Sequence, residues 1–190
     1  LPEEKTTNPM HSNPVVHILS RLLVCGTGAC VFTSHAAPPP AGDWPCFRGP
    51  DRSGIAPAGN ESIPLDWSDT KNILWKTALP GRGASSPIIW GDSIYLTAYS
   101  GYGLEKNDHH SNLPKLTRHL ICVDRKTGAI RWKTDRGASS DRPEHSVINF
   151  LALHGYASST PTADDLGVYV HYGVTGVIAY DHNGRERWYT

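Results

Sequence analysis

The chain has 190 residues, and its 18 Lys and Arg are balanced by 18 Asp and Glu, so the formal net charge is zero. This balance argues against the basic surface with which proteins neutralise nucleic-acid phosphates. The 18 Gly and 15 Pro, together with 6 Trp and 8 Tyr but a single Met, are typical of a turn-rich β protein and not of a helical bundle. We therefore expect an all-β fold without a nucleic-acid partner.

An export signal is indicated near the start of the chain. Arg21 precedes the apolar run 22–32, and the small-residue site 34–36 follows it, which is the order of elements in a secretory signal peptide. The run is too short to span a bilayer as a stable helix, so we expect no transmembrane segment once the chain is cleaved after Ala36. Lipidation at Cys30 and an uncleaved anchor stay open as alternatives.

Composition divides the chain into three regions. Residues 1–36 are assigned to upstream residues and the signal peptide, 37–72 to a Pro/Gly-rich tether and extended arm, and 73–190 to folded repeats. We expect the aromatic side chains of the arm to dock on the folded body. These aromatic residues are Trp44, Phe47 and Trp67.

Removal of the signal leaves two cysteines, Cys46 and Cys122. Two are too few for the disulfide framework of a small secreted domain. One bridge between them is possible. The alternative, a loop cysteine at 46 and a buried strand cysteine at 122, is the interpretation we favour. The sequence has no Cys-x-x-Cys pair, which excludes zinc ribbons and thioredoxin-like redox centres.

From Ile73 onward the sequence is a series of expected β-strands. Short runs rich in β-branched and aromatic residues alternate with Gly, Pro and Asp, which is the pattern of strands and turns. A helical period appears only at 146–153. The expected strands are 73–79, 86–90, 93–99, 119–124, 129–134, 167–172, 176–180 and 185–189.

The strands repeat. Ala84-Ser85-Ser86-Pro87 recurs at Ala157-Ser158-Ser159, and a motif with Asp, Gly and Trp recurs with its Gly and Trp each 56 residues later. Each copy comprises three strands, a tight turn and a fourth strand that carries Trp, as in a four-stranded antiparallel blade of a β-propeller. The structural repeat residues are Trp75, Trp132, Trp188, Asp124, Gly128, Asp181 and Gly184.

Each repeat residue has an expected physical role. The Asp side chain binds backbone N–H groups of its own turn, and the Gly supplies the positive φ that the turn requires. The Trp on the outer strand packs its indole against the neighbouring blade. We expect Trp132 and Trp188 to occupy the same environment, because the repeat relates them.

The chain resembles secreted proteins with pyrroloquinoline-quinone-type (PQQ-like) propeller repeats. The resemblance covers residues 43–190, although Cys46 stands where the arm usually carries Gln. It implies a quinoprotein alcohol dehydrogenase-like β-propeller, of which about two blades are present, similar to the propeller lipoprotein of the outer-membrane barrel assembly machinery. The motifs that carry the resemblance are Trp44-Pro45, Phe47-Arg48-Gly49-Pro50, Ser53-Gly54 and the Asp-x-x-Thr-Gly-x-x-x-Trp of 124–132.

The resemblance implies an exported, non-catalytic scaffold or binding module. We expect it in the periplasm or cell envelope of a Gram-negative-type bacterium, with other envelope proteins as partners. The alternative is a quinoprotein-like oxidoreductase whose cofactor site lies in blades outside this chain. Such dehydrogenases use vicinal cysteines and an acidic calcium cluster, and this sequence contains neither. We therefore assign no catalytic, cofactor-binding or metal-binding residues and no cofactor.

Two other groups of reactive residues have simpler explanations. Asp108, His109 and His110, with His119 downstream, are residue types that bind metal ions. A polar loop exposed to solvent accounts for these residues equally well. His154, Ser158 and Ser159 are residue types found in hydrolases, but Ser85 and Ser86 repeat the serines in the other copy. We expect the serines to satisfy backbone groups near strand ends.

The export hypothesis can be tested by introducing a charged residue into the apolar run 22–32. Val24→Arg is expected to block secretion, because the arginine would have to enter an apolar channel. Mass spectrometry of the secreted wild-type protein should show an N-terminus at Ala37. A soluble cytoplasmic product that retains its sequence from Met10 would contradict the hypothesis.

Overall fold

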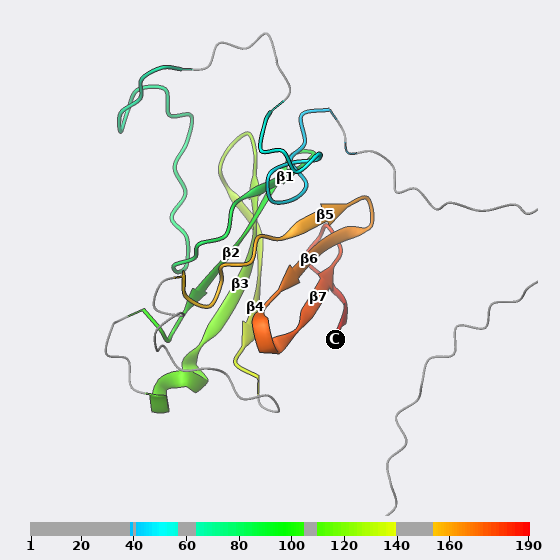
Figure 1. The fold of residues 1–190 in the computed structure, drawn as a ribbon. Coiled ribbons are helices and arrows are strands. Elements are labelled where there is room, and N and C mark those ends of the chain that lie inside the picture. The colour runs from blue at the N-terminus through cyan, green and yellow to red at the C-terminus, as the bar shows by residue number, and fades with distance from the viewer. Residues whose placement is uncertain (1–38, 40, 57–63, 105–109, 140–153) are drawn as a thin grey trace, which may run out of the picture. The chain divides into compact units, whose positions relative to one another are not determined.

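The computed structural model describes residues 39, 41–56, 64–104, 110–139 and 154–190. These residues form two four-stranded antiparallel sheets, each with its strands in chain order (Figure 1). The all-β expectation is confirmed for this part of the chain. Its only helical segments longer than a single residue are two 3-10 turns, η1 and η2.

The first sheet contains β1–β4 and the second contains β5–β8. In the first sheet the strands are β1 (Ile88–Trp90), β2 (Ser93–Ser100), β3 (Thr117–Asp124) and β4 (Ile130–Gly137), and η1 (His110–Lys115) lies between β2 and β3. In the second sheet they are β5 (Thr162–Asp164), β6 (Gly167–His171), β7 (Val177–Tyr180) and β8 (Glu186–Tyr189), with η2 (Gly173–Thr175) between β6 and β7.

The segment 73–79, expected to be a strand, is not one. A strand needs a backbone ladder with a neighbour, whereas this segment is held through its side chains. Trp75 Nε1 donates to Arg125 O at 3.1 Å, and the Thr77 hydroxyl donates to Gly128 O. The segment is therefore extended but irregular. The expected helical stretch 146–153 lies outside the described residues.

The two tight turns that precede the outer strands are built alike. Asp124 Oδ1 accepts the N–H groups of Lys126 and Thr127 at 3.0 and 2.8 Å. Gly128 has φ 74°, in the left-handed region that favours glycine. The Arg131 guanidinium and the turn N–H groups together hold the pKa of Asp124 well below its usual range.

The second turn repeats this arrangement one sheet later. Asp181 Oδ1 accepts the N–H groups of Asn183 and Arg185, both at 2.9 Å, and Gly184 has φ 81°. Bonds from the turn N–H groups, that of Arg185 first, lower the pKa of Asp181. The spacing of Asp and Gly differs by one residue between the copies, but both carboxylates close their own turn.

Each turn glycine lies under a tryptophan from an earlier part of the chain. A Cβ atom on Gly128 would be 2.5 Å from the ring of Trp75, and one on Gly184 would be 2.8 Å from the ring of Trp132. Trp132 Nε1 also donates to His182 O at 3.0 Å, the counterpart of the bond from Trp75. We call this combination of ring packing and Nε1 bond the tryptophan–glycine contact.

The strand register also repeats around the outer tryptophans. Tyr95, Cys122 and Trp132 are cross-strand neighbours in the first sheet, and Tyr169, Ala179 and Trp188 are their counterparts in the second. The Tyr95 and Trp132 rings are 5.7 Å apart at 43°, and the Tyr169 and Trp188 rings are 6.1 Å apart at 40°. A register shift follows Cys122 and recurs after Ala179.

Trp188 nevertheless differs from Trp132 in its environment. Its side chain is 48% exposed, and no turn glycine lies under its ring within the described residues. The expectation that both tryptophans occupy the same environment is therefore wrong for this structure. Within the described residues, Trp132 packs on the turn of the second sheet, and no further sheet covers Trp188.

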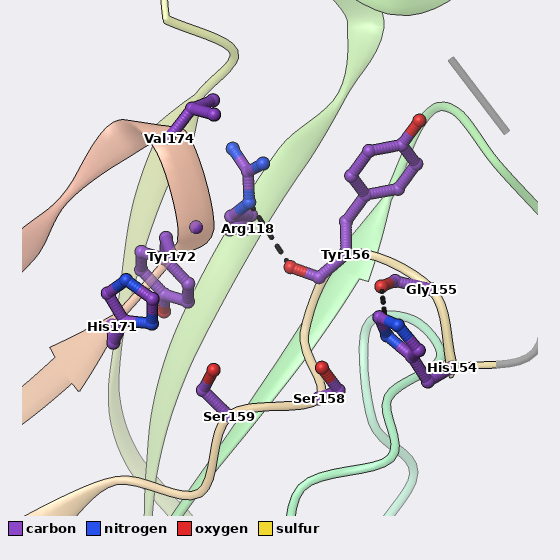
Figure 2. A pocket seen from close by; sticks show the side chains of 10 residues that line it. Arg118, His154, Gly155, Tyr156, Ser158, Ser159, His171, Tyr172 and Val174 are labelled. Carbon is purple, nitrogen blue, oxygen red and sulfur yellow. Dashed lines mark hydrogen bonds between the residues drawn. The ribbon is translucent and has the colours of Figure 1, made fainter. Parts of the chain in front are cut away.

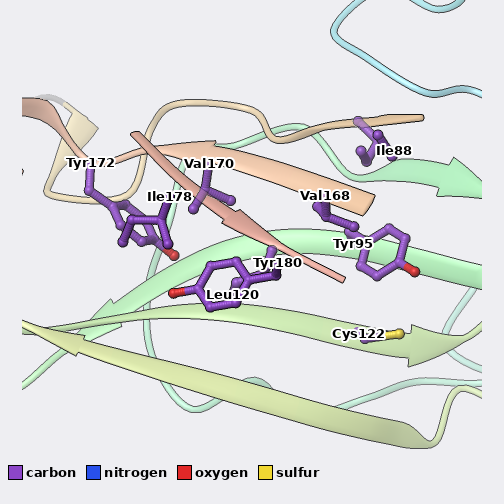
Figure 3. Packing of buried hydrophobic residues seen from close by; sticks show 10 residues of the cluster. Ile88, Tyr95, Leu120, Cys122, Val168, Val170, Tyr172, Ile178 and Tyr180 are labelled. Atoms are coloured by element: carbon purple, nitrogen blue, oxygen red, sulfur yellow. The ribbon is translucent and has the colours of Figure 1, made fainter. Parts of the chain in front are cut away.

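The largest buried cluster contains residues of both sheets (Figure 3). His182, in the turn between β7 and β8, connects the sheets: its Nδ1 lies 3.0 Å from Tyr95 Oη and its ring stacks on Trp90. Burial raises the pKa of Tyr95 to about 12, so this hydroxyl stays protonated and can donate. The cluster comprises Ile88, Tyr95, Leu120 and Cys122 of the first sheet and Ala163, Val168, Val170, Tyr172, Ile178 and Tyr180 of the second.

Of the three aromatic residues of the arm, only Trp44 is paired with the first sheet, and it is paired through its backbone. Trp44 pairs with Ile89 as an isolated β-bridge, whereas Phe47 and Trp67 are 60% and 71% exposed. The expectation of docking is wrong for these two, which lack backbone pairing to hold them on the sheet. Cys46 and Cys122 are both free, and Cys122 is buried in β3, as the favoured interpretation predicts.

The described part of the chain contains no helix with the length and apolar character needed to cross a bilayer.

The tryptophan–glycine contact is tested by Gly184→Ala. The new methyl group would overlap the Trp132 ring, so the variant should lose at least about 1 kcal/mol more stability than left-handed strain alone explains. Gly91→Ala is the matched control, because Gly91 has φ 57° and nothing within 4 Å of an added Cβ. Urea unfolding followed by circular dichroism measures both. Equal losses would show that Trp132 does not pack tightly on this turn.

Candidate functional site

A cavity of about 170 Å³ lies among residues of both sheets (Figure 2). It is formed where β3 begins and β6 ends, together with the segment that precedes β5. The wall includes hydroxyl, imidazole and guanidinium groups next to aromatic rings. The residues that line it are Arg118, His154, Gly155, Tyr156, Ser158, Ser159, His171, Tyr172, Gly173 and Val174.

Arg118 organises this cavity. Its side chain is 2% exposed; Nε donates to Tyr156 O and Nη1 to Thr175 Oγ1, both at 3.2 Å. The guanidinium also lies 5.6 and 5.8 Å from the ring centres of Tyr156 and Tyr172, within the range of cation–π attraction. One arginine at the start of β3 thus ties together the segment before β5 and the turn η2.

Tyr172 and His154 contribute polar atoms to the cavity region. Burial raises the pKa of Tyr172, so its hydroxyl remains protonated. That hydroxyl makes no hydrogen bond within the described part of the chain. His154 Nδ1 lies 3.0 Å from Gly155 O, and a carbonyl oxygen only accepts, so this nitrogen carries the proton. These two residues therefore place a buried hydroxyl and an imidazole with a buried nitrogen beside the cavity.

The structure brings together the three residues considered for a hydrolase. His154, Ser158 and Ser159 all line the cavity, but Figure 2 shows the two serines on one irregular segment and His154 on the turn before it. In the other repeat, Ser85 Oγ accepts from Thr97 N at 3.0 Å and donates to Thr97 O at 3.2 Å. This is the expected backbone-satisfying role, at one of the repeated serine positions.

A Ser–His–Asp array that the sequence analysis missed crosses the first sheet. His119 Nε2 lies 2.8 Å from Ser100 Oγ, and its Nδ1 lies 2.6 Å from Asp135 Oδ1. Burial raises the pKa of Asp135, but bonds from Lys133 and His119 lower it more, so the carboxyl is ionised at neutral pH. His119 Nδ1 therefore donates to Asp135, and in the neutral ring Nε2 accepts the Ser100 hydroxyl proton.

Ser100, His119 and Asp135 are bonded in the order of a Ser–His–Asp catalytic triad, but their burial indicates a structural role. His119 is only 4% exposed, and neither cavity described here is lined by Ser100. The three residues come from β2, β3 and β4, so their bonds join three strands side to side. The pairing of His119 with Asp135 depends on strand register, which local sequence does not reveal.

A second cavity, of about 290 Å³, is apolar. It lies on the face of the first sheet that is turned toward the segment 73–79. Carbon atoms dominate its wall, so it suits hydrophobic side chains better than a charged ligand. It is lined by Trp75, Thr77, Leu79, Pro87, Ile89, Ile94, Leu96 and Val123.

No group of three metal-ligating side chains occurs among the described residues. Asp108 and His109 lie outside those residues. His119, considered with them, is instead bonded to Ser100 and Asp135. Burial raises the pKa of the Cys122 thiol, which disfavours the thiolate that metal binding and nucleophilic attack require.

Neither a scan of protein-family models nor a search of curated proteins finds a match for this sequence.

The His119 network is tested through the acid dependence of stability. Because the folded-state pKa of Asp135 lies below its unfolded value, its ionised form stabilises the fold above the unfolded pKa, and this contribution is lost as pH falls through the folded pKa. Asp135→Asn should lower stability at pH 7 by at most about 1 kcal/mol, since the carboxylate is partly exposed. The gap between wild type and variant should then begin to shrink near about pH 4 and close as pH falls through the lower folded-state pKa.

The control is Asp92→Asn, which removes an exposed ion pair with Lys126. It should change stability by less than about 0.5 kcal/mol at either pH. Urea unfolding of both variants at pH 7 and at pH 2.5 distinguishes them. A constant gap for Asp135→Asn would show that its charge does not support the network.

Proposed function

We propose that the two sheets are consecutive blades of a quinoprotein-like β-propeller, and that this propeller is an exported, non-catalytic scaffold of the cell envelope that binds other envelope proteins. The signal-peptide pattern of residues 1–36 supports export. The repeated motifs and their resemblance to PQQ-like proteins support the repeat type. A binding function suits a rigid framework whose loops gather at the strand ends.

One observation carries the proposal: the tryptophan–glycine contact occurs twice with the same geometry. Trp75 packs on Gly128 and Trp132 packs on Gly184, and each Nε1 donates to the carbonyl of the residue after the turn Asp. The Trp132 contact joins one sheet to the next, and the Trp75 contact joins the segment 73–79 to the first sheet in the same way. Further contacts of this kind would generate a series of similar sheets. Radial repetition of four-stranded sheets is the architecture of a propeller.

The cavity around Arg118 is the part of this scaffold best suited to recognition. It joins loop segments of both sheets, and its polar groups are held by strands on either side. Rigid strands with ligand-facing loops are the usual arrangement of binding sites on repeat folds. Because aromatic rings lie beside the polar groups in its wall, the cavity suits a partner group that has both an apolar part and a polar atom.

The proposal is tested by separating packing from cofactor binding at Trp132. Trp132→Ala should cost about 3 kcal/mol of unfolding free energy, because a large aromatic packed between the sheets is removed. Wild type and variant should both show no binding in absorbance titrations with pyrroloquinoline quinone and calcium. Trp67→Ala is the control, because that side chain is 71% exposed and its loss should be close to neutral.

Two results together would favour the oxidoreductase instead. They are a loss below about 1 kcal/mol for Trp132→Ala and tight quinone binding by the wild type that the variant lacks. Trp132 would then be a cofactor-stacking residue and not a packing residue.

A further inference from the structure

Two adjacent residues of the arm bond to different sheets. Trp44 N–H donates to Ile89 O at 3.0 Å and Ile89 N–H donates to Trp44 O at 2.9 Å, so the arm pairs with β1. Pro45 O accepts the N–H of Ala163, in β5, at 2.8 Å and the hydroxyl of Thr162 at 3.2 Å. One short stretch of extended backbone therefore links the first strand of one sheet to the first strand of the other.

These bonds are made on the open edges of the two sheets. Within its sheet β1 is paired only with β2, and β5 only with β6. An open edge presents backbone N–H and C=O groups that can pair with another chain, and natural proteins often cover such edges with a loop. The two sheets contact each other most extensively at β1 and β5, so a single segment can reach both edges.

A buried carboxylate anchors this segment at its first residue. Asp43 is only 7% exposed, and its Oδ2 accepts the N–H of Gly91 at 2.8 Å. Gly91 lies in the turn between β1 and β2. Because hydrogen bonds to a carboxylate are stronger than those between neutral groups, Asp43 fixes the start of the segment on the first sheet.

The loop 46–54 braces the segment from its other end. The Trp44 ring packs on Gly49, where an added Cβ atom would lie 2.8 Å from the ring. Gly54 N–H donates to Arg48 O at 2.9 Å and closes the loop. Arg48 has φ 65°, a conformation that non-glycine residues hold only where their surroundings support it. The loop is therefore a compact unit that fixes the Trp44 ring.

We propose that residues 43–45 form a strap, which docks on both sheets as one unit and keeps the backbone edges of β1 and β5 covered. Its anchor is on the first sheet, at Asp43, and its far end is on the second sheet, at Pro45. Release of the anchor therefore uncovers both edges together. The inference uses only contacts within the described residues and does not depend on the scaffold function proposed above.

Hydrogen exchange followed by NMR on the full chain tests the strap at both edges. Asp43→Ala should raise the exchange rates of the Gly91 and Ala163 amides at least about tenfold, because loss of the carboxylate favours release of the segment. The Ala163 amide is the informative one, since it bonds to Pro45 O on the second sheet and not to the Asp43 side chain.

The control for this variant is Asp51→Ala. The Asp51 carboxylate accepts the N–H and hydroxyl of Ser53 within the loop, so its loss should leave exchange at Ala163 unchanged. The amide of Ile121, a buried residue of β3, should exchange slowly in both variants. A rise at Ile121 equal to that at Ala163 would mean that the whole fold opens, and would overturn the strap as a separate unit.

Two glycine variants perturb the strap from the loop. Gly49→Ala places a methyl group against the Trp44 ring, whereas Gly42→Ala introduces similar left-handed strain, at φ 85° against 82°, with nothing within 4 Å of the new Cβ. Only Gly49→Ala should speed exchange at Ala163. Equal effects of the two variants would overturn the proposal. So would exchange at Ala163 that stays unchanged in both Asp43→Ala and Gly49→Ala, because the arm would then rest on the first sheet alone.

Discussion

The packing of a tryptophan on the turn glycine of the following sheet is the constraint on which this structure depends. The ring needs a position without a Cβ, and the turn needs a positive φ, so glycine satisfies two requirements at Gly128 and again at Gly184. The Nε1 bond to a turn carbonyl then fixes the orientation of the ring. The position of one sheet on the next follows from this contact and from the apolar cluster beneath it.

Polar side chains secure the regions that this contact does not reach. The Ser100–His119–Asp135 array joins three strands of the first sheet, and Arg118 bonds to two segments outside it. Both networks satisfy buried polar groups that would otherwise destabilise the fold. Arg118 also lies in the wall of the cavity between the sheets.

The sequence predicted the strands and turns well where their formation depends on neighbouring residues in the chain. Alternating apolar residues and Asp-to-Gly turns located β2, β3, β4 and β6–β8 to within a few residues. It failed at 73–79, whose composition is that of a strand but which has no backbone ladder in the described structure. It failed also for Phe47 and Trp67, because apolar character alone does not say whether a neighbouring surface exists for a side chain to cover.

The sequence by itself determined the all-β class, the repeat and the residues that build each turn, because these depend on spacing and on the backbone preferences of Asp and Gly. Only the tertiary structure decided that Trp132 packs between the two described sheets, while Trp188 is 48% exposed. It alone brought His119 to Asp135 and Arg118 to the cavity wall. Those contacts depend on strand register and on the stacking of sheets, which join residues far apart in the chain.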